Sequence, residues 1–402
     1  MIGRRLPGVA SPISPAALAH AFVASVWAPQ ALSTRATRRV ETRFGASRAL
    51  LTDSGTSALV LALRVAVPPG GVVGFPGFAC VDLAAAARFA GVRVRLYDLD
   101  PASLSPDLDS VDQLLRRGVD AIVVAHLFGY PADVPGVRER AARAGVPVIE
   151  DSAQGAAGTL HGRRLGSLGD LAVLSFGRGK GLCAGGGGAL LAFDARWSGA
   201  LDALALSAPS RGWTNLSATA VQWALGRPSL YAIPSVMPWL HLGEMVYHAA
   251  REPGSLSLGS CALIESAIDM EDTDVAVRRA NARAYDDAVR GAARVTPTLS
   301  ITGGAPGYLR YAVRDLADER GACATLGILR SYPRTLAEQE ELQPMLVACE
   351  PPTPGASELR QTSFTLPTHR FVNTRDTHAI AAWLHDARAL QRAFRPDEHR
   401  SM

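Results

Sequence analysis

The sequence contains one lysine. Lys180 stands against 40 arginines in a chain of 402 residues. A lysine amine can lose its proton and act as a nucleophile, whereas the guanidinium of arginine stays protonated in proteins. Because arginine serves every other basic position, the retention of Lys180 indicates a chemical role that requires a primary amine.

Lys180 lies in a glycine-rich segment, SFGRGKGLCAGGGG, between two predicted strands at 171–176 and 189–194. A phosphate-binding P-loop would need Ser or Thr after the lysine and a helix beyond it, but Gly181 and a strand follow. A dinucleotide-binding fingerprint is excluded for the same reason. The pattern favours a lysine that forms a Schiff base with a cofactor aldehyde.

A second chemical candidate is Asp151, which ends the apolar strand VPVIED, 29 residues before Lys180. A carboxylate at the end of a buried strand needs a cationic partner or several donors. The protonated pyridine nitrogen of pyridoxal phosphate is such a partner. The alternative is an aspartate that caps the following turn, but together with Lys180 the cofactor role is favoured.

A third candidate is the segment DSGTSAL (53–59), which begins a predicted helix with small hydroxyl residues. A helix N-terminus offers free N–H groups and the positive end of the helix dipole, and both favour a phosphate. Gly55, Thr56 and Ser57 would supply these groups, and Ser175 could add a hydroxyl. The alternative is a simple N-cap.

These candidates are separated by alternating strand and helix patterns. Such units imply an α/β fold with a mostly parallel sheet, in which ligands bind at the carboxyl ends of the strands. We expect a large domain over 1–270 and a small C-terminal α/β domain over 271–402, which begins with a linking helix at 272–291. The predicted helices are 56–67, 83–91, 107–118 and 134–145, and the predicted strands are 71–75, 92–100, 121–128, 146–151, 171–176 and 189–194.

Residues 200–250 interrupt this order with an apolar, aromatic stretch broken by Pro228, Pro234 and Pro238. We interpret it as a helical excursion that packs on the large domain or in a dimer interface. A membrane-surface element at 214–250 is the alternative.

Composition narrows the function classes. At 48% hydrophobic and 19% charged residues, the chain can bury a sizeable core, and its net charge of +4 includes no basic run that would indicate nucleic-acid binding. The five cysteines are widely spaced without a CxxC pair, so a cytoplasmic location is expected. No signal peptide, membrane span, metal-ligand spacing or GxSxG elbow is expected, so no metal site is predicted.

Several strings together resemble one family. SGTSALVLAL, VVAHLFGYPADV, VIEDSAQGAAG and KGLCAGGGGALL follow in order within residues 50–195, and the C-terminal part matches more loosely. On these strings the sequence is similar to the DegT-type nucleotide-sugar aminotransferases, which are pyridoxal-phosphate enzymes of fold type I.

The resemblance implies roles for single residues. Lys180 would form the Schiff base and carry a proton between cofactor and substrate carbons, and Asp151 would hold the pyridine nitrogen. Gln154 would contact the cofactor near its phenolic oxygen, with a surface glutamine as the alternative. It also implies a homodimer that passes an amino group, often from glutamate, to a keto group of a nucleotide-linked sugar. The implied phosphate binders are Gly55, Thr56 and Ser175.

The sequence departs from the family in three places. Cys80 stands where an aromatic side chain usually stacks on the pyridine ring, so either Cys80 or Phe78 would contact the cofactor. The alternative for Cys80 is a small buried apolar residue; a redox role is disfavoured. The glycine-rich string lacks the usual Glu, and EPGSLSLGSCAL lacks the Asn and Arg that reach the neighbouring subunit. The lysine argues against the family's dehydratase branch, which has histidine there.

Other classes remain as alternatives: a pyridoxal-phosphate enzyme of another reaction type or with a non-sugar substrate, or a non-catalytic protein of this fold in regulation or membrane-associated assembly. Lys180 argues against a scaffold, which needs no such amine. His126 and His369 are further candidates for contact with cofactor or substrate, each with a buried structural histidine as the alternative.

Overall fold

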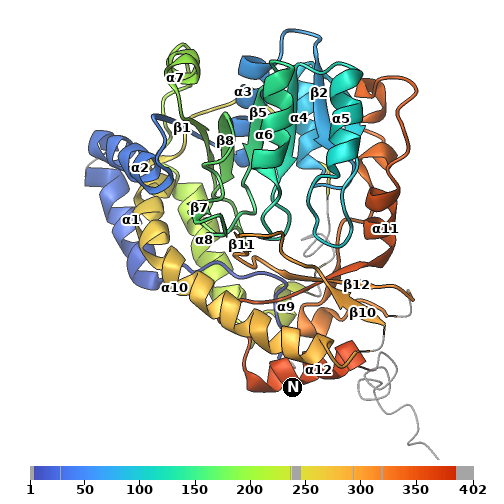
Figure 1. Cartoon of the computed structure of the whole chain (residues 1–402). Helices are drawn as coiled ribbons and strands as arrows, with labels where there is room; N and C mark the ends of the chain where they lie inside the picture. The colour runs from blue at the N-terminus through green and yellow to red at the C-terminus, as the bar shows by residue number, and fades with distance from the viewer. Residues whose placement is uncertain are drawn as a thin grey trace, which may run out of the picture.

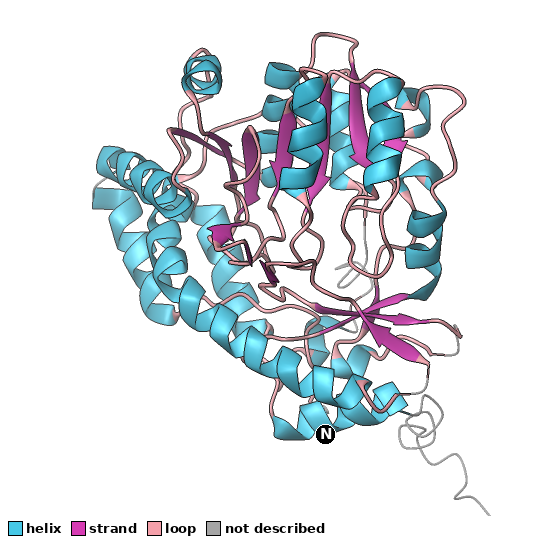
Figure 2. Cartoon of the chain, viewed as in Figure 1, coloured by secondary structure: helices cyan, strands magenta, loops and turns pink. Residues whose placement is uncertain are grey.

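A seven-stranded sheet forms the centre of the computed structural model, which describes residues 4–27, 29–235, 237, 246–292, 294–317 and 320–385. The strand order is β1-β9-β8-β5-β4-β2-β3, and within this sheet β9 alone runs opposite to the other strands. The strands are β1 (Arg48–Thr52), β2 (Val72–Pro76), β3 (Arg93–Tyr97), β4 (Ala121–Ala125), β5 (Val148–Asp151), β8 (Leu171–Ser175) and β9 (Gly188–Ala192). Figures 1 and 2 show helices on both sides of this sheet.

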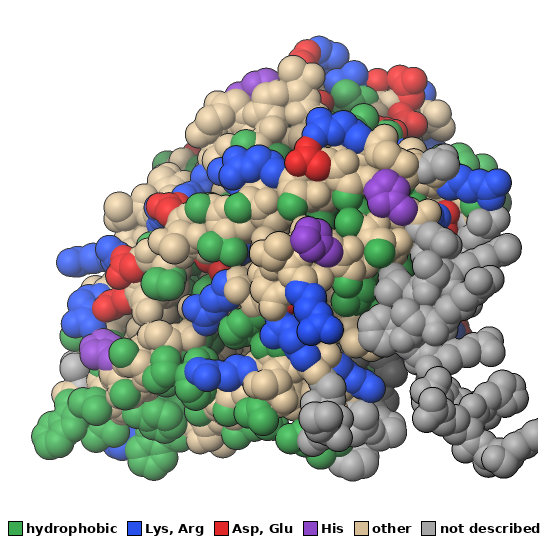
Figure 3. Space-filling model, turned by 90° about the horizontal axis from the view of Figure 1, so that it is seen from below, with side chains coloured by type: hydrophobic (Ala, Val, Ile, Leu, Met, Phe, Trp, Pro, Cys, Tyr) green, Lys and Arg blue, Asp and Glu red, His purple; other side chains and the backbone are tan. Residues whose placement is uncertain are grey.

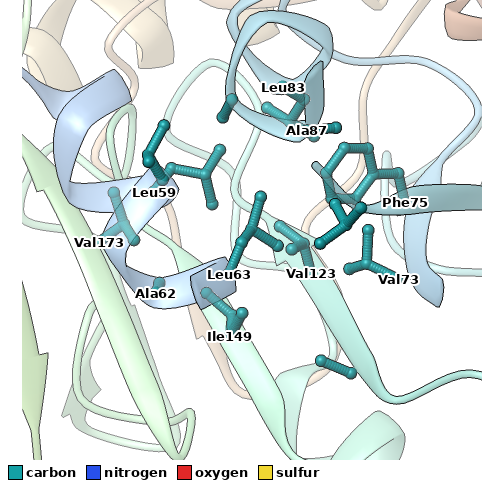
Figure 4. Packing of buried hydrophobic residues seen from close by; sticks show 14 of the residues in the cluster. Leu59, Ala62, Leu63, Val73, Phe75, Leu83, Ala87, Val123, Ile149 and Val173 are labelled. Atoms are coloured by element: carbon teal, nitrogen blue, oxygen red, sulfur yellow. The ribbon is translucent and has the colours of Figure 1, made fainter. Parts of the chain in front are cut away.

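Alternate residues of the central strands pack against different helix pairs. Val123 of β4 belongs to a cluster with α3 (Gly55–Ala66) and α4 (Asp82–Ala90), part of which Figure 4 shows. Ile122 and Val124 of the same strand belong to a cluster with α5 (Leu108–Arg116) and α6 (Val134–Arg143). Since both faces of β4 are covered, its uninterrupted apolar sequence AIVVA is explained. The predicted α/β fold with a mostly parallel sheet is confirmed.

A layer of helices covers the β1–β9 side of the sheet. The helix α10 (Leu258–Val289) packs against α1 (Pro15–Trp27), α2 (Pro29–Phe44) and α8 (Trp213–Leu225), and it continues to the C-terminal sheet (Figure 1). It begins well before the linking helix expected at 272–291, because Ser257 caps it and its first turns are buried. The short helix α7 (Ala195–Asp202) contacts β1 and β9.

The C-terminal part contains a four-stranded antiparallel sheet in the order β10-β12-β14-β13. The helices α11 (Pro354–Thr362) and α12 (Thr374–His385) accompany it, and Phe364 and Trp383 meet edge to face in its core. We call this C-terminal part the small domain. Its strands are β10 (Val295–Pro297), β12 (Tyr311–Asp315), β13 (Leu329–Arg330) and β14 (Ser363–Leu366); β6 (Thr159–Leu160), β7 (Arg163–Arg164) and β11 (Gly304–Ala305) form a third sheet, and the 3-10 helices are η2 (Ala324–Leu326), η3 (Leu336–Glu338) and η4 (Gln343–Met345).

The apolar excursion contains α8 and the single turn α9 (Ala232–Ser235). The former packs against α1 and α10, as expected of a helical excursion on the large domain. Residues 236 and 238–245 of the expected element lie outside the described residues. Across the described ranges, none of the helices is both long and apolar enough to cross a membrane.

Candidate active site

A cavity of about 320 Å³ opens where the parallel strands end. Asp151 and Ser175 are the last residues of β5 and β8, and His126 directly follows β4. The structure brings seven of the nine predicted site residues to this cavity: Gly55, Thr56, Cys80, Asp151, Gln154, Ser175 and Lys180. Residues far apart in sequence are thus gathered by the sheet topology at one place.

The carboxylate of Asp151 can accept a further hydrogen bond. Its Oδ1 accepts a hydrogen bond from the Ala153 N–H at 2.9 Å, and Oδ2 has no hydrogen-bond partner among the described residues. Burial raises the pKa of Asp151, although the Ala153 N–H and the charge of Lys180 oppose the change. A cationic N–H donor in the cavity would stabilise the charged carboxylate.

The N-terminus of α3 forms another wall. Ser54 caps the helix by accepting a hydrogen bond from the Ser57 N–H at 3.0 Å, and the first helical residues, Gly55 and Thr56, line the cavity. Gly55 packs so closely on the end of β8 that a Cβ atom there would lie 2.8 Å from Cβ of Ser175. Two N–H groups at the positive end of a helix, with the Thr56 and Ser175 hydroxyls, form an anion-binding arrangement.

Lys180 lies on the loop that joins β8 to β9. The Phe176 N–H donates to Gly187 O at 2.8 Å and the Ala184 N–H to Phe176 O at 2.9 Å, so these bonds close the base of the loop. The Lys180 side chain has no hydrogen-bond or ion-pair partner among the described residues. Its positive charge lowers the pKa of both Cys80 and Asp151, against the larger effect of burial, which places the amine within their electrostatic reach.

Gln154 is held at both ends of its amide. Its Oε1 accepts a hydrogen bond from the Phe128 N–H at 3.0 Å, and its Nε2 donates to the Tyr332 hydroxyl at 2.8 Å. Tyr332 also lines the cavity, and it comes from the small domain. Tyr332 could not be predicted as a site residue, because its segment SYPRT carries no periodic or motif signal and reaches the cavity only in the folded chain.

Two predicted residues lie elsewhere. Ser57 is buried and donates its hydroxyl to Asp53 Oδ1 at 2.5 Å, so it helps to close the helix cap and does not line the cavity. Phe78 is fully buried and packs against the ring of Tyr332, with ring centroids 5.0 Å apart. Of these two rings, only that of Tyr332 lines the cavity.

Cys80 lines the cavity as a small side chain. Its sulfur donates to Asp82 Oδ2 at 3.4 Å. Burial raises the pKa of the Cys80 thiol, and the neighbouring Asp82 carboxylate adds to this effect. Because the thiolate is the reactive form, this environment suits a packing residue rather than a redox one.

His126 and Glu150 form a buried pair, of which only His126 was a candidate from the sequence. Its Nδ1 accepts a hydrogen bond from the Ala132 N–H at 3.0 Å, so Nε2 carries the proton and donates to Glu150 Oε1 at 2.7 Å. Burial alone would raise the pKa of Glu150, but the bond to His126 and the N–H groups of Gly166 and Leu168 outweigh it, and the pKa is lowered. Both histidine nitrogens are occupied, so His126 supports the cavity wall.

His369 lies outside the cavity. Its Nε2 is 2.8 Å from the carbonyl oxygen of Pro7, and its Nδ1 accepts a long hydrogen bond from the Phe371 N–H at 3.3 Å. Burial lowers the pKa of His369 to about 4, and Arg310 adds to the decrease, against opposing effects from the bond to the Pro7 carbonyl and from Asp274. It is therefore a buried, neutral structural histidine, the alternative left open by the sequence.

This environment predicts a pH-dependent stability. The unfolded chain takes up a proton on His369 below about pH 6.5, whereas the folded protein resists it down to about pH 4. The contribution of neutral His369 to the free energy of unfolding is therefore fully present above pH 6.5. It decreases by up to ~3 kcal/mol as the pH falls from about 6.5 to about 4. Urea unfolding at several pH values should show a flatter profile for His369→Gln than for the unsubstituted protein. The exposed His20→Gln control should keep the slope, and equal slopes for both variants would contradict the assignment.

Comparison with known proteins shows which family the chain resembles. The model of the DegT/DnrJ/EryC1/StrS aminotransferase family matches residues 31–219, which include all nine predicted site residues. This part of the chain is therefore similar to that family. The family resemblance expected from the sequence is thereby confirmed.

Curated relatives of the family align over different lengths. A UDP-N-acetyl-3-dehydro-alpha-D-glucosamine 3-aminotransferase of Acidithiobacillus ferrooxidans is 36% identical over 144 residues, 35% of this chain and 39% of the relative. An L-glutamine:2-deoxy-scyllo-inosose aminotransferase of Micromonospora echinospora is 31% identical over 295 residues, 71% of this chain and 63% of the relative. The chain thus spans less than half of the first relative and less than two thirds of the second.

Solved structures extend the comparison of the fold to both domains. An aminotransferase of Streptoalloteichus hindustanus superimposes with a TM-score of 0.73 at 24% identity, over 96% of this chain and all of the other. A 3-amino-5-hydroxybenzoic acid synthase gives a TM-score of 0.73 at 22% identity, over 97% and 100%. The chain therefore has the fold of these aminotransferases, small domain included.

Proposed function

We propose that this protein is a pyridoxal-phosphate-dependent aminotransferase that acts on a keto group of a sugar, with Lys180 as the catalytic amine. One observation carries the proposal: the only lysine of the chain lines the same cavity as Asp151 and the N-terminus of α3. The family that the chain resembles and the names of its relatives support it.

The residues present fit the cofactor. Asp151 Oδ2, which has no hydrogen-bond partner among the described residues, suits a protonated pyridine nitrogen. Gly55 can pack this closely on Ser175 only because glycine has no Cβ, and this keeps the helix N-terminus beside the Ser175 hydroxyl, where both could hold a phosphate. The Gln154 amide is fixed by Phe128 and Tyr332 and lines the cavity, so it would contact the part of the cofactor between the pyridine nitrogen and the phosphate.

Each residue then has a physical task. Bound pyridoxal phosphate would supply an electron sink for the substrate carbon that carries the amine. Asp151 would hold a proton at the pyridine nitrogen, and Gly55, Thr56 and Ser175 would hold the phosphate. Lys180 Nζ, the only side-chain amine of the chain, would bond the cofactor and then move a proton between carbon atoms of cofactor and substrate.

For the acceptor we favour a nucleotide-linked sugar, and for the donor glutamate. The names of two relatives support this acceptor, since one names a UDP-linked sugar and the other a dTDP-linked sugar. A second candidate is a ketone without a nucleotide, aminated from glutamine. The Micromonospora relative, whose alignment covers 71% of this chain, is named for that reaction.

A product assay separates the two candidates. The purified protein with pyridoxal phosphate is incubated with glutamate or glutamine and with a UDP- or dTDP-linked keto-sugar or 2-deoxy-scyllo-inosose, and aminated products are detected by mass spectrometry. Amination of a nucleotide-linked sugar from glutamate supports the first candidate, and amination of the inosose from glutamine supports the second. Failure of every pair, in a protein that binds the cofactor, would contradict a sugar acceptor.

The proposal includes a cytoplasmic homodimer. The five cysteines are all free, as expected in a reducing compartment. Exposed apolar side chains on α1 and α8, among them Trp27 and Trp213, could pack against a second copy. Light scattering coupled to gel filtration would give twice the chain mass of 42.3 kDa for a dimer and that mass for a monomer.

Gly55→Ala should weaken cofactor binding. The added Cβ would lie 2.8 Å from Cβ and 3.0 Å from Oγ of Ser175, so the helix N-terminus must shift and lose part of its phosphate contacts. Losing one such hydrogen bond to a charged group reduces affinity by about tenfold or more. The control Gly199→Ala adds a Cβ with no atom within 4 Å. The affinity of each variant for pyridoxal phosphate is measured by titration. Equal affinities of the two variants would contradict a phosphate site at the N-terminus of α3.

A further inference from the structure

A second cavity of about 330 Å³ lies behind the loop that carries Lys180. Gly177 and Lys180 line the active-site cavity, whereas Arg178 between them lines the second one. The opposite walls come from the N-terminal arm (residues 5–13), the helices α8 and α9, and small-domain residues such as Leu329. The lysine loop therefore separates two cavities.

The N-terminal arm is fixed over this cavity by bonds to three parts of the fold. Arg5 N–H donates to Pro228 O at 3.0 Å and Leu6 N–H to Thr325 O at 2.9 Å. The Ser11 hydroxyl accepts from the Gly179 N–H and from Gln222 Nε2, both at 3.2 Å. Hydrogen bonds between segments that are remote in sequence thus hold this wall of the cavity in place.

All charged side chains that line the second cavity are arginines. They are Arg5 and Arg310, which are partly buried, and Arg178 and Arg370, which are exposed. Within the described ranges, none of the four forms an ion pair with a carboxylate, and no carboxylate lines the cavity. Such a concentration of unpaired positive charge indicates a site for an anion.

Arg310 gives the strongest indication. Its Nη2 donates to the carbonyl oxygens of Gly327 and Thr365, both at 3.1 Å, while its buried Nε has no acceptor among the residues that the structure describes. Burial lowers the pKa of Arg310 to about 10. A guanidinium removed from water without an anionic partner is unfavourable, and a bound anion would relieve this.

The rest of the lining is mostly apolar and partly aromatic. Val9, Ile13, Trp223 and Phe371 contribute to it, and Arg227 stacks on the ring of Trp223 at 4.1 Å. Viewed from below, the molecule shows blue basic side chains beside green apolar ones on one face (Figure 3). An apolar wall disfavours strongly hydrated polyanions and suits a single anionic group on an apolar body.

We propose that this second cavity binds an organic carboxylate with an apolar, ring-sized body. The planar guanidinium groups match a carboxylate in two-point hydrogen bonding, and the aromatic lining matches the body. The proposal does not depend on the reaction at Lys180. It does place a ligand against the loop that positions Lys180, on the side opposite to the active-site cavity.

The test compares 1-naphthoate with the neutral 1-naphthalenemethanol by isothermal titration calorimetry on the full chain. Val221 lines the cavity from α8 and is 57% exposed, so Val221→Glu adds a negative charge without disturbing a core. Val23 on α1 is 59% exposed and does not line the cavity, so Val23→Glu is the matched control.

We expect naphthoate to bind at least about tenfold more tightly than the alcohol, and Val221→Glu to weaken naphthoate binding by about tenfold through like-charge repulsion. Val23→Glu should leave it unchanged, and Lys180→Ala should retain it. Equal binding of both probes, no binding of naphthoate, or equal effects of the two glutamate variants would overturn the proposal. Loss of naphthoate binding in Lys180→Ala alone would assign the ligand to the active-site cavity and overturn it as well.

Discussion

Lys180→Ala should reduce amino transfer by at least ~10⁴-fold, because the variant loses both the covalent anchor for the cofactor and the group that moves the proton. No second lysine exists in the chain to replace it. The side chain has no hydrogen-bond partner among the described residues, so its removal should leave the thermal unfolding midpoint nearly unchanged. Steady-state kinetics and a thermal melt on the same preparation test both statements.

Lys180→Arg separates charge from nucleophilicity. Arginine keeps the positive charge near Asp151 and Cys80, but its guanidinium does not deprotonate. We expect this variant to be as inactive as the alanine variant, and added methylamine to restore part of the activity of Lys180→Ala only. An arginine variant with near-normal activity would show that Lys180 acts through its charge, and the proposed mechanism would be wrong.

Asp151→Asn should reduce kcat by about 10²–10³-fold, the scale observed when one group that stabilises charge in the transition state is removed. The amide is nearly the same size and its oxygen can still accept from the Ala153 N–H. It has no negative charge with which to hold a proton on the pyridine nitrogen. The variant should therefore fold and still bind pyridoxal phosphate while it reacts slowly.

Asp82→Asn is the control within the same cavity. Asp82 lines the cavity and accepts a hydrogen bond from Cys80, but the proposal gives it no part in holding the pyridine nitrogen. Its effect on kcat should be within about tenfold. If the two asparagine variants had equal effects, Asp151 would be only one of several charges near the site, and its specific role would be contradicted.

The sequence predicted the parts of the site that belong to continuous strings. Asp151 ends an apolar strand and Gly55 begins a helix, so their positions at the carboxyl edge of the sheet followed from the order of elements. Lys180 was found from composition, as the one lysine of the chain, together with its glycine-rich setting between two predicted strands. Their meeting in one cavity follows from the parallel sheet, whose strands end at the same edge.

Other contacts had no local signal. Tyr332 reaches the cavity from the small domain, and Glu150 supports His126 from a buried strand position that reads as part of an apolar run. Phe78, one of the two residues proposed to contact the cofactor, does not line the cavity, and its ring packs against that of Tyr332, which does. Pairwise contacts of this kind depend on how domains pack, and periodicity carries no information about it.

The same limit applies to the fold. The α/β order of the large domain was predicted because strands and helices there alternate with clear apolar periods. The helix α1 was not among the predicted helices, although Pro15 stands in its first turn, where proline is favoured. The early start of α10 was missed because its apolar first turns are buried under α1 and α8, and no polar face marks them.

The most direct test of the account is an absorbance spectrum of the purified protein with pyridoxal phosphate, before and after addition of glutamate and then of glutamine, beside Lys180→Ala. We expect a visible band from the lysine-bound cofactor that one of the two donors bleaches, and no such band in the variant. A protein that shows no band, or the same band with and without Lys180, would contradict the central claim that Lys180 bonds the cofactor.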